Sequence, residues 1–387
     1  MRVGLVCPYS LSLPGGVQGQ VLGLGHALRA RGVEARVLGP CDGPPPDANI
    51  TPLGNSIPLA ANGSVAPLAP DLPATLRVIR ALRDEAFDVV HIHEPLVPGP
   101  TLSATIFCDS PMVGTFHRSG KSAGYRITAP LSRIAVGRLA IRTAVSDQAR
   151  LTAMDVVGGD YEVLWNGIDT DRFAAASPWP DGRRDGVRTV LFIGRHEQRK
   201  GLAVLVDAMA RLGPEIRLCI AGEGPDTARL RRLTEGDDRI EWLGTINDVE
   251  KVGRLRAADV FCAPSLEGES FGVVLLEGMA AGAAVVASDL VGYATVARPG
   301  VDALMVPPGD AAALADAIGR AAAGGPAIEA MISSARERAD GFSMRRLAAR
   351  YLELYESIVV PRRSPPPARL LMRRKARRSL PRAAKPG

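Results

Sequence analysis

Short apolar runs alternate with longer amphipathic stretches along almost the whole chain. In the first half the apolar runs predict strands, and the stretches between them predict helices. The predicted strands are 2–7, 35–39, 89–93, 112–116, 143–146 and 162–165, and the predicted helices include 17–31, 74–83 and 129–141. This alternation is typical of parallel sheets whose crossover helices cover both faces.

The second half repeats the pattern. Its predicted strands are 189–194, 216–221, 240–243, 260–263 and 284–288, with helices at 202–211, 249–258 and 271–281. We therefore expect an α/β protein with two doubly wound units, divided into residues 1–168 and 169–342. The amphipathic segment 343–360 predicts a closing helix, and the Pro-rich segment 42–70 predicts a long loop.

The length of 387 residues exceeds the usual size of one core, which agrees with two domains. The five cysteines are scattered, without a CxxC pair or a metal-ligand spacing, and this indicates a reducing compartment. The first apolar run is too short for a signal peptide, and no other run reaches transmembrane length. We expect a cytoplasmic protein.

Charge is concentrated at one end of the chain. Ten of the 47 basic residues and none of the 41 acidic ones follow Glu356, so the remainder carries a net charge of −4. An acidic body argues against nucleic acid as a partner. The tail 361–387 is rich in Pro and Arg and suggests attachment to an anionic membrane surface, because each base near such a surface contributes about 1 kcal/mol. A second contact is expected at 76–83, and a disordered basic extension is the alternative for the tail.

The strongest chemical signal is the stretch from Gly268 to Gly282. It holds two carboxylates, Glu269 and Glu277, around a glycine-rich loop that leads into an apolar helix. The start of a helix offers free N–H groups and a positive dipole to an anion. An anion between two carboxylates suggests a sugar nucleotide; solvated glutamates on an ordinary crossover are the alternative.

A second signal follows the strand 189–194. Arg195 and Lys200 lie between the end of this strand and the next helix, with Arg199 beside them. Cations at this position suit a diphosphate leaving group, because they offset the charge that develops as the group departs. The alternative is a solvated basic loop.

The first half carries weaker signals. Gly15 and Gly16 precede a helix, as in loops that cradle phosphates, and a tight turn is the alternative. GxGxxG is absent and so is an acid after the second strand, which argues against a nicotinamide site. His91 and His93 alternate on one strand without a third metal ligand nearby, so we expect a structural role for them. His117 ends the next strand and is expected to hydrogen-bond a sugar hydroxyl or to face a developing positive charge.

The Glu269–Glu277 pair, the Arg195–Lys200 pair, the Gly15–Gly16 loop and His117, in this order and spacing, closely resemble the retaining glycosyltransferases of family four. The resemblance runs from residue 1 to about 360 and is strong because all its elements occur in order. It implies the GT-B architecture: two facing Rossmann-like doubly wound domains with a central cleft. It also implies that the last helix crosses back onto the first domain.

The resemblance assigns roles to individual residues. Arg195 and Lys200 are implied at the donor diphosphate, Glu277 at the ribose, and Glu269 at the transferred sugar. The implied catalytic set is His117, Arg195, Lys200 and Glu269. The implied donor-binding set is Gly16, Arg195, Arg199, Lys200, Asp248, Lys251, Glu269, Ser270, Phe271, Gly272, Val273 and Glu277.

Within this family, segments such as His91-Ile92-His93-Glu94-Pro95 resemble the bacterial branch that transfers mannose from GDP-mannose to phosphatidylinositol. That branch has a tyrosine and an arginine where this chain has Ala61 and Pro67. The lost arginine serves the acceptor phosphate, and we expect Arg118 or Lys121 to replace it. The implied acceptor-binding set is Tyr9, Gln18, Asn62, Ser64 and Arg118.

The implied reaction is the transfer of a hexose with retention, with departure and attack on the same face, because no carboxylate pair flanks the sugar closely. The substrates are a nucleotide sugar and a phosphoinositide-type lipid, on the inner face of the plasma membrane. No tightly bound cofactor and no protein metal site are expected, and a role for Mg²⁺ is left open. The alternatives are another donor and acceptor, a GT-B nucleotide-sugar epimerase, and a membrane protein that binds the nucleotide without catalysis.

Overall fold

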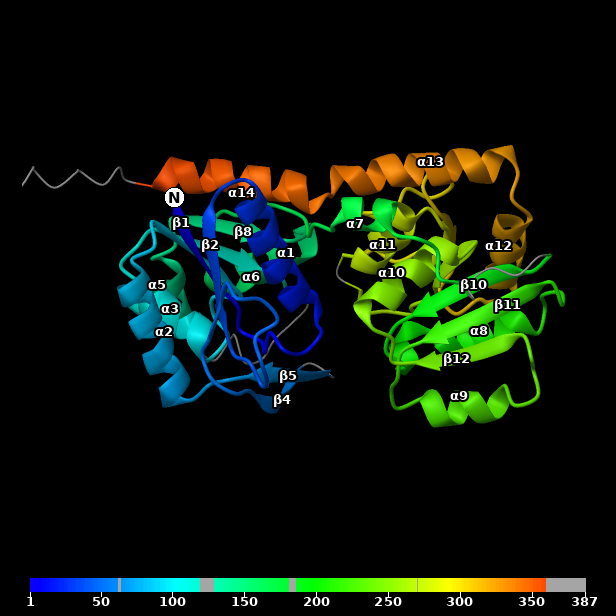
Figure 1. Ribbon diagram of the computed structural model, residues 1–387, viewed down its shortest axis with the longest axis horizontal. Helices are drawn as coiled ribbons and strands as arrows, with labels where there is room; N and C mark the ends of the chain where they lie inside the picture. Colours follow the sequence, from blue (N-terminus) through cyan, green and yellow to red (C-terminus); the bar gives the residue numbers. More distant parts are fainter. Residues whose placement is uncertain (62–63, 119–128, 181–185, 270, 360–387) are drawn as a thin grey trace, which may run out of the picture.

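A computed structural model describes residues 1–61, 64–118, 129–180, 186–269 and 271–359. Two α/β halves lie side by side, and the helices α13 and α14 run along one side of both (Figure 1). Each half contains its own parallel sheet, so the predicted fold class is confirmed.

The elements of the first half are β1 (Arg2–Val6), α1 (Gly16–Ala30), β2 (Glu34–Gly39), β3 (Ile50–Pro52), β4 (Ile57–Ala61), β5 (Ser64–Leu68), α2 (Leu72–Glu85), β6 (Val89–His93), α3 (Pro100–Phe107), β7 (Met112–Phe116), α5 (Ala129–Val136), β8 (Ile141–Ala144), α6 (Asp147–Val157) and β9 (Glu162–Val163). After them come α7 (Thr170–Ala175), β10 (Arg188–Ile193), the 3-10 turn η2 (Gln198–Lys200), α8 (Leu202–Met209), β11 (Ile216–Ala221), α9 (Thr227–Leu233), β12 (Ile240–Gly244), α10 (Asp248–Ala257), β13 (Val260–Ala263), α11 (Val273–Ala281), β14 (Ala284–Ser288), β15 (Leu304–Val306), α12 (Ala311–Ala323), α13 (Pro326–Gly341) and α14 (Met344–Ile358).

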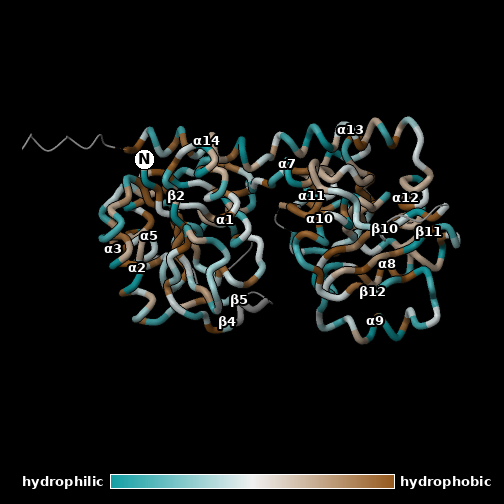
Figure 2. Tube along the Cα trace, in the orientation of Figure 1, coloured by the Kyte–Doolittle hydropathy of each residue, from teal (hydrophilic) through white to brown (hydrophobic). Residues whose placement is uncertain are grey.

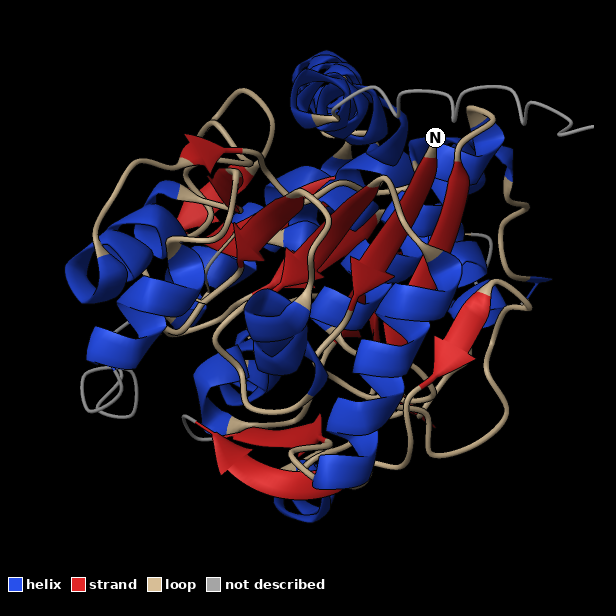
Figure 3. Cartoon of the chain, turned by 90° about the vertical axis from the view of Figure 1, so that its left-hand side faces the viewer, coloured by secondary structure: helices blue, strands red, loops and turns tan. Residues whose placement is uncertain are grey.

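The first sheet has seven parallel strands in the order β3-β2-β1-β6-β7-β8-β9. Side chains alternate between its faces: Leu5 packs toward α1 and α14, whereas Val6 packs toward α2, α3, α5 and α6. Helices therefore cover both faces of the sheet, as Figure 3 shows from the end of the molecule. The strand order reverses between β1 and β6, and ligands bind at such a switch point, outside the carboxyl ends of the strands.

The second sheet has six parallel strands in the order β12-β11-β10-β13-β14-β15. One face packs on α7, α10, α11 and α13, and the other on α8, α9 and α12. Its switch point lies between β10 and β13, and Figure 1 draws β10, β11 and β12 with their arrowheads toward the first half. Figure 2 shows hydrophobic stretches gathered inside each half, where these two-sided cores lie.

The closing helix α14 belongs to the core of the first half. Met344, Ala348, Tyr351 and Tyr355 follow a helical period and are all buried in the cluster that includes α1. Burying one such aromatic side chain stabilises a fold by roughly 1.5–3 kcal/mol. The last helix therefore returns to the sheet that begins the chain.

The chain passes between the halves twice, and the two passages are bonded to each other. Ile168 donates its N–H to the carbonyl of Phe342 at 3.0 Å, and Met344 donates to the carbonyl of Ile168 at 2.7 Å. The buried Gln20 of α1 bonds both the N–H and the carbonyl of Gly167 at 2.8 Å. This junction is fixed by hydrogen bonds rather than by a loose linker.

Several boundaries differ from the sequence predictions. Segment 42–70 was expected to be one loop, but it contains β3 and the β4–β5 hairpin. The helix expected over 129–141 ends at Val136, because the chain turns through Gly137 and Ile141 starts β8. The last helix ends at Ile358, and none of the described helices is long and apolar enough to cross a membrane.

Candidate active site

Two loops meet at the switch point of the second sheet, one after β10 and one after β13. Gly201 ends the first loop with a φ of 68°, and a Cβ added there would lie 1.8 Å from the carbonyl oxygen of Pro264 in the second. The N–H of Leu266 donates to the carbonyl of Arg199 at 2.7 Å. Only glycine allows this approach, and it brings the cations of the first loop to the carboxylate of the second.

Lys200 and Glu269 form the centre of this site. The Nζ of Lys200 lies 2.5 Å from Oε1 of Glu269, with side chains 20% and 11% exposed. The same carboxylate oxygen accepts from the hydroxyl of Ser265 at 2.9 Å, and Ser265 accepts from the hydroxyl of Tyr293 at 3.2 Å. Burial raises the pKa of Tyr293, which keeps its hydroxyl protonated as a donor.

Glu197 separates the two arginines of the first loop. Its Oε1 lies 2.9 Å from Nε of Arg195, and its Oε2 lies 2.9 Å from Nε of Arg199. Each arginine is thus held through Nε, and Nη1 of Arg199 lies 4.0 Å from Oε1 of Glu269. The three predicted cations and Glu269 therefore form one cluster.

The second carboxylate of the motif has a cation of its own. Glu277 lies on α11 and its Oε1 is 2.5 Å from Nζ of Lys251 on α10, with side chains 15% and 25% exposed. Asp248, at the start of α10, instead pairs with Arg172 of α7 at 2.5 Å. The structure therefore brings Lys251 to Glu277, and it pairs Asp248 with Arg172, which the sequence analysis did not consider.

Helix α11 begins at Val273, two residues later than predicted, because Gly272 takes a φ of 94° and cannot continue a helix. Phe271 is 2% exposed and packs edge-on against Phe342, so its side chain belongs to the core and only its backbone can serve a ligand. Ser270 lies outside the described residues.

In the first half, α1 starts at Gly16, after the loop that follows β1. The helix has no side-chain cap at Gly15, and a Cβ added to Gly16 would meet nothing within 4 Å. This start of a helix offers its N–H groups to open space. Gln18 is buried and its Nε2 donates to the carbonyl of Ser10 at 3.4 Å, so its amide supports the loop after β1.

His91 has a structural role, as predicted. It is fully buried, with Nδ1 2.6 Å from the hydroxyl of Tyr355 and Nε2 2.6 Å from the hydroxyl of Thr115. Both ring nitrogens are thus used to join β6, β7 and α14. Within the described ranges there is no group of three or more residues that could hold a metal ion.

His93 and His117 form a pair beside it. Nδ1 of His93 lies 2.9 Å from Nε2 of His117, and burial lowers the pKa of His117 to about 3. The backbone N–H of His117 donates to Oε1 of Glu94 at 2.6 Å. Glu94 has a φ of 52° before a proline, a strained conformation that costs about 1–3 kcal/mol and is typical of functional sites.

The expected acceptor residues gather where the β4–β5 hairpin meets the loop after β1. Tyr9 forms an isolated antiparallel β-bridge with Leu68, and the backbone N–H of Ser10 donates to the carbonyl of Pro67 at 3.0 Å. Burial raises the pKa of Tyr9, the charge of Glu94 raises it further, and Arg118 opposes this shift. Arg118 therefore lies within electrostatic reach of Tyr9. Asn62 and Lys121 lie outside the described residues, as does the side chain of Ser64 at the start of β5.

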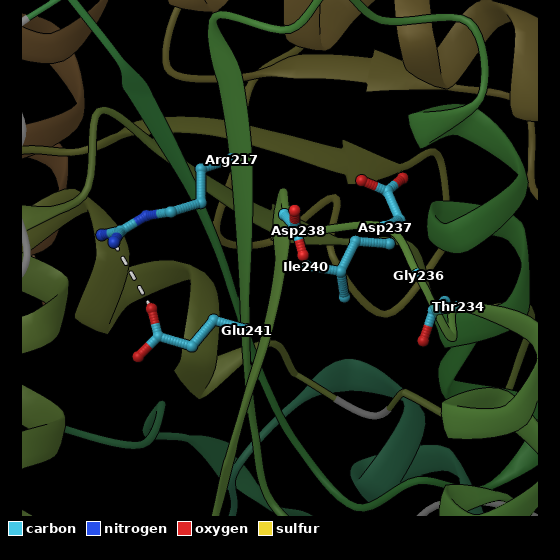
Figure 4. Close-up of a pocket in the computed structure, with 7 residues that line it drawn as sticks. All are labelled: Arg217, Thr234, Gly236, Asp237, Asp238, Ile240 and Glu241. Carbon is cyan, nitrogen blue, oxygen red and sulfur yellow. Dashed lines mark hydrogen bonds and ion pairs between the residues drawn. The ribbon is translucent and has the colours of Figure 1, made fainter.

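A separate hollow lies at the amino ends of β11 and β12 (Figure 4), whereas the cation cluster lies at the carboxyl ends of β10 and β13. It is lined by Arg217, Thr234, Gly236, Asp237, Asp238, Ile240 and Glu241. Arg217 is nearly buried and pairs with Glu241 at 3.3 Å. Because ligands of such sheets bind outside the carboxyl ends of the strands, this hollow is separate from the candidate site.

Sequence reasoning missed three contributors to the site: Glu197, Ser265 and Tyr293. Glu197 lies between Arg195 and Arg199 in the loop after the strand 189–194, and its position between two arginines was a usable signal. Ser265 follows β13, so the rule that ligands gather at strand ends could have selected it. Tyr293 had no local signal, because only the folded chain brings it to Ser265.

Two family models match the chain. One, described as Glycosyltransferase Family 4, matches residues 14–172, and the other, described as Glycosyl transferases group 1, matches residues 187–323. The "Phosphatidyl-myo-inositol mannosyltransferase" of Mycobacterium leprae is 39% identical over 92% of this chain and 97% of that protein.

Solved structures resemble the whole fold. The sucrose-phosphate synthase of Thermosynechococcus elongatus has a TM-score of 0.72 at 22% identity, covering 92% of this chain and 98% of that one. The Anabaena protein HepE, in complex with UDP and glucose, has a TM-score of 0.70 at 19% identity, covering 92% of this chain and 100% of that one. These likenesses identify the fold as GT-B.

Proposed function

The chain belongs to glycosyltransferase family 4, and from that premise we propose that it transfers mannose from GDP-mannose to a phosphatidylinositol-type lipid with retention of configuration. The enzyme class follows from the family. The identity of the donor, the identity of the acceptor and the membrane location are the proposal.

The observation that carries the proposal is the cluster at the carboxyl ends of β10 and β13, where Lys200 and Arg199 lie at Glu269 and Glu197 links Arg199 to Arg195. A diphosphate bound here meets three fixed cations, and a sugar attached to it comes within reach of a carboxylate. Fixed charges stabilise a departing group best in a site that does not have to reorganise. Glu197 supports this by holding two of the cations through Nε.

The mechanism follows from these contacts. Lys200 and Arg195 bind the diphosphate oxygens and offset the charge that appears on them as the bond to the sugar breaks. Glu269 accepts hydrogen bonds from the sugar hydroxyls and is itself oriented by Ser265 and Tyr293. The acceptor hydroxyl attacks on the face from which the diphosphate departs, and its proton passes to the departing oxygen. Glu277 and Lys251 bind the nucleoside end.

The relatives support the acceptor, because proteins named phosphatidyl-myo-inositol mannosyltransferase are 36–39% identical to this chain. The residues around Tyr9 support it too. Arg118 is a cation on the acceptor side of the first half, and it suits the lipid phosphate in place of the arginine that Pro67 replaces.

A lipid acceptor implies work at a membrane. Helix α2 supports such a contact, because Leu72 and Leu76 are 67% and 58% exposed beside the exposed bases Arg77, Arg80 and Arg83. Apolar and basic side chains on one surface are attracted to an anionic bilayer. The basic tail, residues 361–387, lies outside the described residues and stays part of the proposal, as does the inner face of the plasma membrane.

The test uses the purified full chain with GDP-mannose or a UDP-sugar, with and without phosphatidylinositol vesicles. We expect GDP release and a mannosylated lipid only when GDP-mannose and the lipid are both present, with the α anomer in the product. Lys200→Ala provides the background rate. Product formed from the donor alone would favour the epimerase, and activity with a UDP-sugar only would overturn the proposed donor.

Membrane attachment is tested separately by co-sedimentation with anionic and with neutral vesicles. We expect the chain to bind only the anionic ones, with affinity that falls as salt rises. Deleting residues 362–387 should remove most of this binding, and Leu72→Gln with Leu76→Gln should weaken what remains. Unchanged binding in both variants would remove the membrane proposal and leave the proposed reaction intact.

A further inference from the structure

The pair formed by His93 and His117 restricts where each ring can carry its proton. Nδ1 of His93 and Nε2 of His117 are 2.9 Å apart, so one of these atoms donates and the other accepts. The two ring centroids lie 5.1 Å apart, and the ring planes are inclined by 28°. Burial lowers the pKa of both, so each ring is neutral near pH 7 and carries one proton.

The second nitrogen of His93 decides between the two arrangements. His93 is 2% exposed, and its Nε2 is buried without a hydrogen-bond partner among the described residues. Gln20, Thr115, Tyr351 and Asn166 line the same small cavity, and the first three of these side chains are already engaged. Gln20 bonds Gly167 with both ends of its amide, and Thr115 and Tyr351 bond each other.

A buried N–H without an acceptor is rarer in proteins than a buried acceptor without a donor. Nε2 of His93 is therefore the unprotonated atom, and the ring carries its proton on Nδ1. That proton is donated to Nε2 of His117, which must accept it. His117 in turn carries its own proton on Nδ1.

We propose that His93 is a positioning residue that holds His117 in the Nδ1–H tautomer, so that His117 offers the transferred sugar a hydrogen-bond donor and not a basic nitrogen. The inference rests on the proposed function, because it assigns the sugar as the partner of His117. Its consequence for the reaction is that His117 does not take the proton of the acceptor hydroxyl. That proton goes to the departing diphosphate oxygen.

The test reads the tautomer directly. The chain holds five histidines, so the full-length protein can be labelled with ¹⁵N-histidine and its rings distinguished by long-range ¹H–¹⁵N correlation at pH 7. A His117→Gln sample identifies the His117 signals. We expect a protonated Nδ1 and an unprotonated Nε2 on His117; a protonated Nε2 would overturn the proposal.

Variants of His93 test its positioning role. His93→Phe keeps the ring volume but loses the donor, so we expect the His117 signals to leave the pure Nδ1–H pattern. We also expect kcat to fall about tenfold while KM for the donor changes little. His93→Asn places an amide N–H near the former Nδ1 and should recover most of both. An unchanged His117 pattern in His93→Phe would also overturn the proposal.

The matched control is His91→Asn, which changes an equally buried histidine of the same strand that makes no hydrogen bond to His117. It should lower stability and leave the His117 tautomer unchanged. The wild-type spectrum, once its His117 signals are identified with the His117→Gln sample, decides the tautomer without substrate. A chain that transfers no mannose would therefore overturn the proposed function and leave the tautomer result standing.

Discussion

Replacing Lys200 by Ala should separate catalysis from stability. Nζ of Lys200 lies 2.5 Å from Glu269, and both side chains are largely buried, at 20% and 11% exposure. The substitution removes a cation from the expected diphosphate site and leaves the carboxylate with Ser265 and a guanidinium 4.0 Å away. Both effects can be estimated.

Loss of one preorganised group that stabilises developing charge costs about 2.7–4 kcal/mol, so kcat should fall about 100- to 1000-fold. For stability, an exposed pair contributes about 0–1 kcal/mol and breaking a fully buried one costs about 3–5. With these exposures we expect a loss of about 1–3 kcal/mol. For a domain of this size that lowers Tm by about 2–4 °C per kcal/mol.

The matched control is Lys251→Ala. Lys251 pairs with Glu277 at the same 2.5 Å and with similar burial, at 25% and 15% exposure. Its loss should lower Tm by a similar amount but should raise KM for the donor rather than lower kcat, because the proposed mechanism places it at the nucleoside of the donor. Steady-state kinetics gives kcat and KM for both variants, and calorimetric unfolding gives their Tm. Equal losses of kcat in the two variants, or near-normal kcat in Lys200→Ala, would refute the assignment of Lys200.

Three further predictions concern pH and the backbone. Because burial lowers the pKa of His117 to about 3, its ring stays neutral and kcat/KM should show no inflection near pH 6.5. An inflection of kcat/KM near pH 6.5 would contradict a neutral His117. The free energy of unfolding should instead fall as pH drops from about 6.5 toward 3, since only the unfolded histidine binds a proton in this range. Gln20→Ala leaves both backbone groups of Gly167 without their partner and should cost about 1–3 kcal/mol in denaturant unfolding; an unchanged midpoint would argue against the clamp. Gly201→Ala should reduce the folded yield severely, because its Cβ would lie 1.8 Å from a backbone oxygen, whereas Gly186→Ala, with a φ of 71° and open space, should cost only about 1–2 kcal/mol.

The sheets could be predicted from the sequence because their strands are buried on both faces. Runs such as 260–263 are apolar throughout, and such runs are recognisable without any tertiary information. The β4–β5 hairpin was not predicted, because Pro58 and Pro67 are paired in it and prolines in a short segment indicate a loop. The start of α11 was misplaced because a single backbone angle at Gly272 decides it.

The site could be predicted in part. The rule that ligands gather at the carboxyl ends of strands selected Lys200 and Glu269, although 69 positions separate them. Their direct contact was not predictable, because it depends on how closely Gly201 approaches Pro264. The pairing of His93 with His117 depends in the same way on neighbouring strands, and no local pattern reports the distance between two rings.

The return of α14 to the first sheet has a consequence for how the protein is made. One face of that sheet is closed by Met344, Ala348, Tyr351 and Tyr355, which are among the last residues with a described structure. Synthesis proceeds from the N-terminus, so the earlier half leaves the ribosome with α1 on this face but without the part of its cover that α14 supplies. A message shortened before codon 344 would therefore yield a first half in which the surface that α14 buries stays exposed.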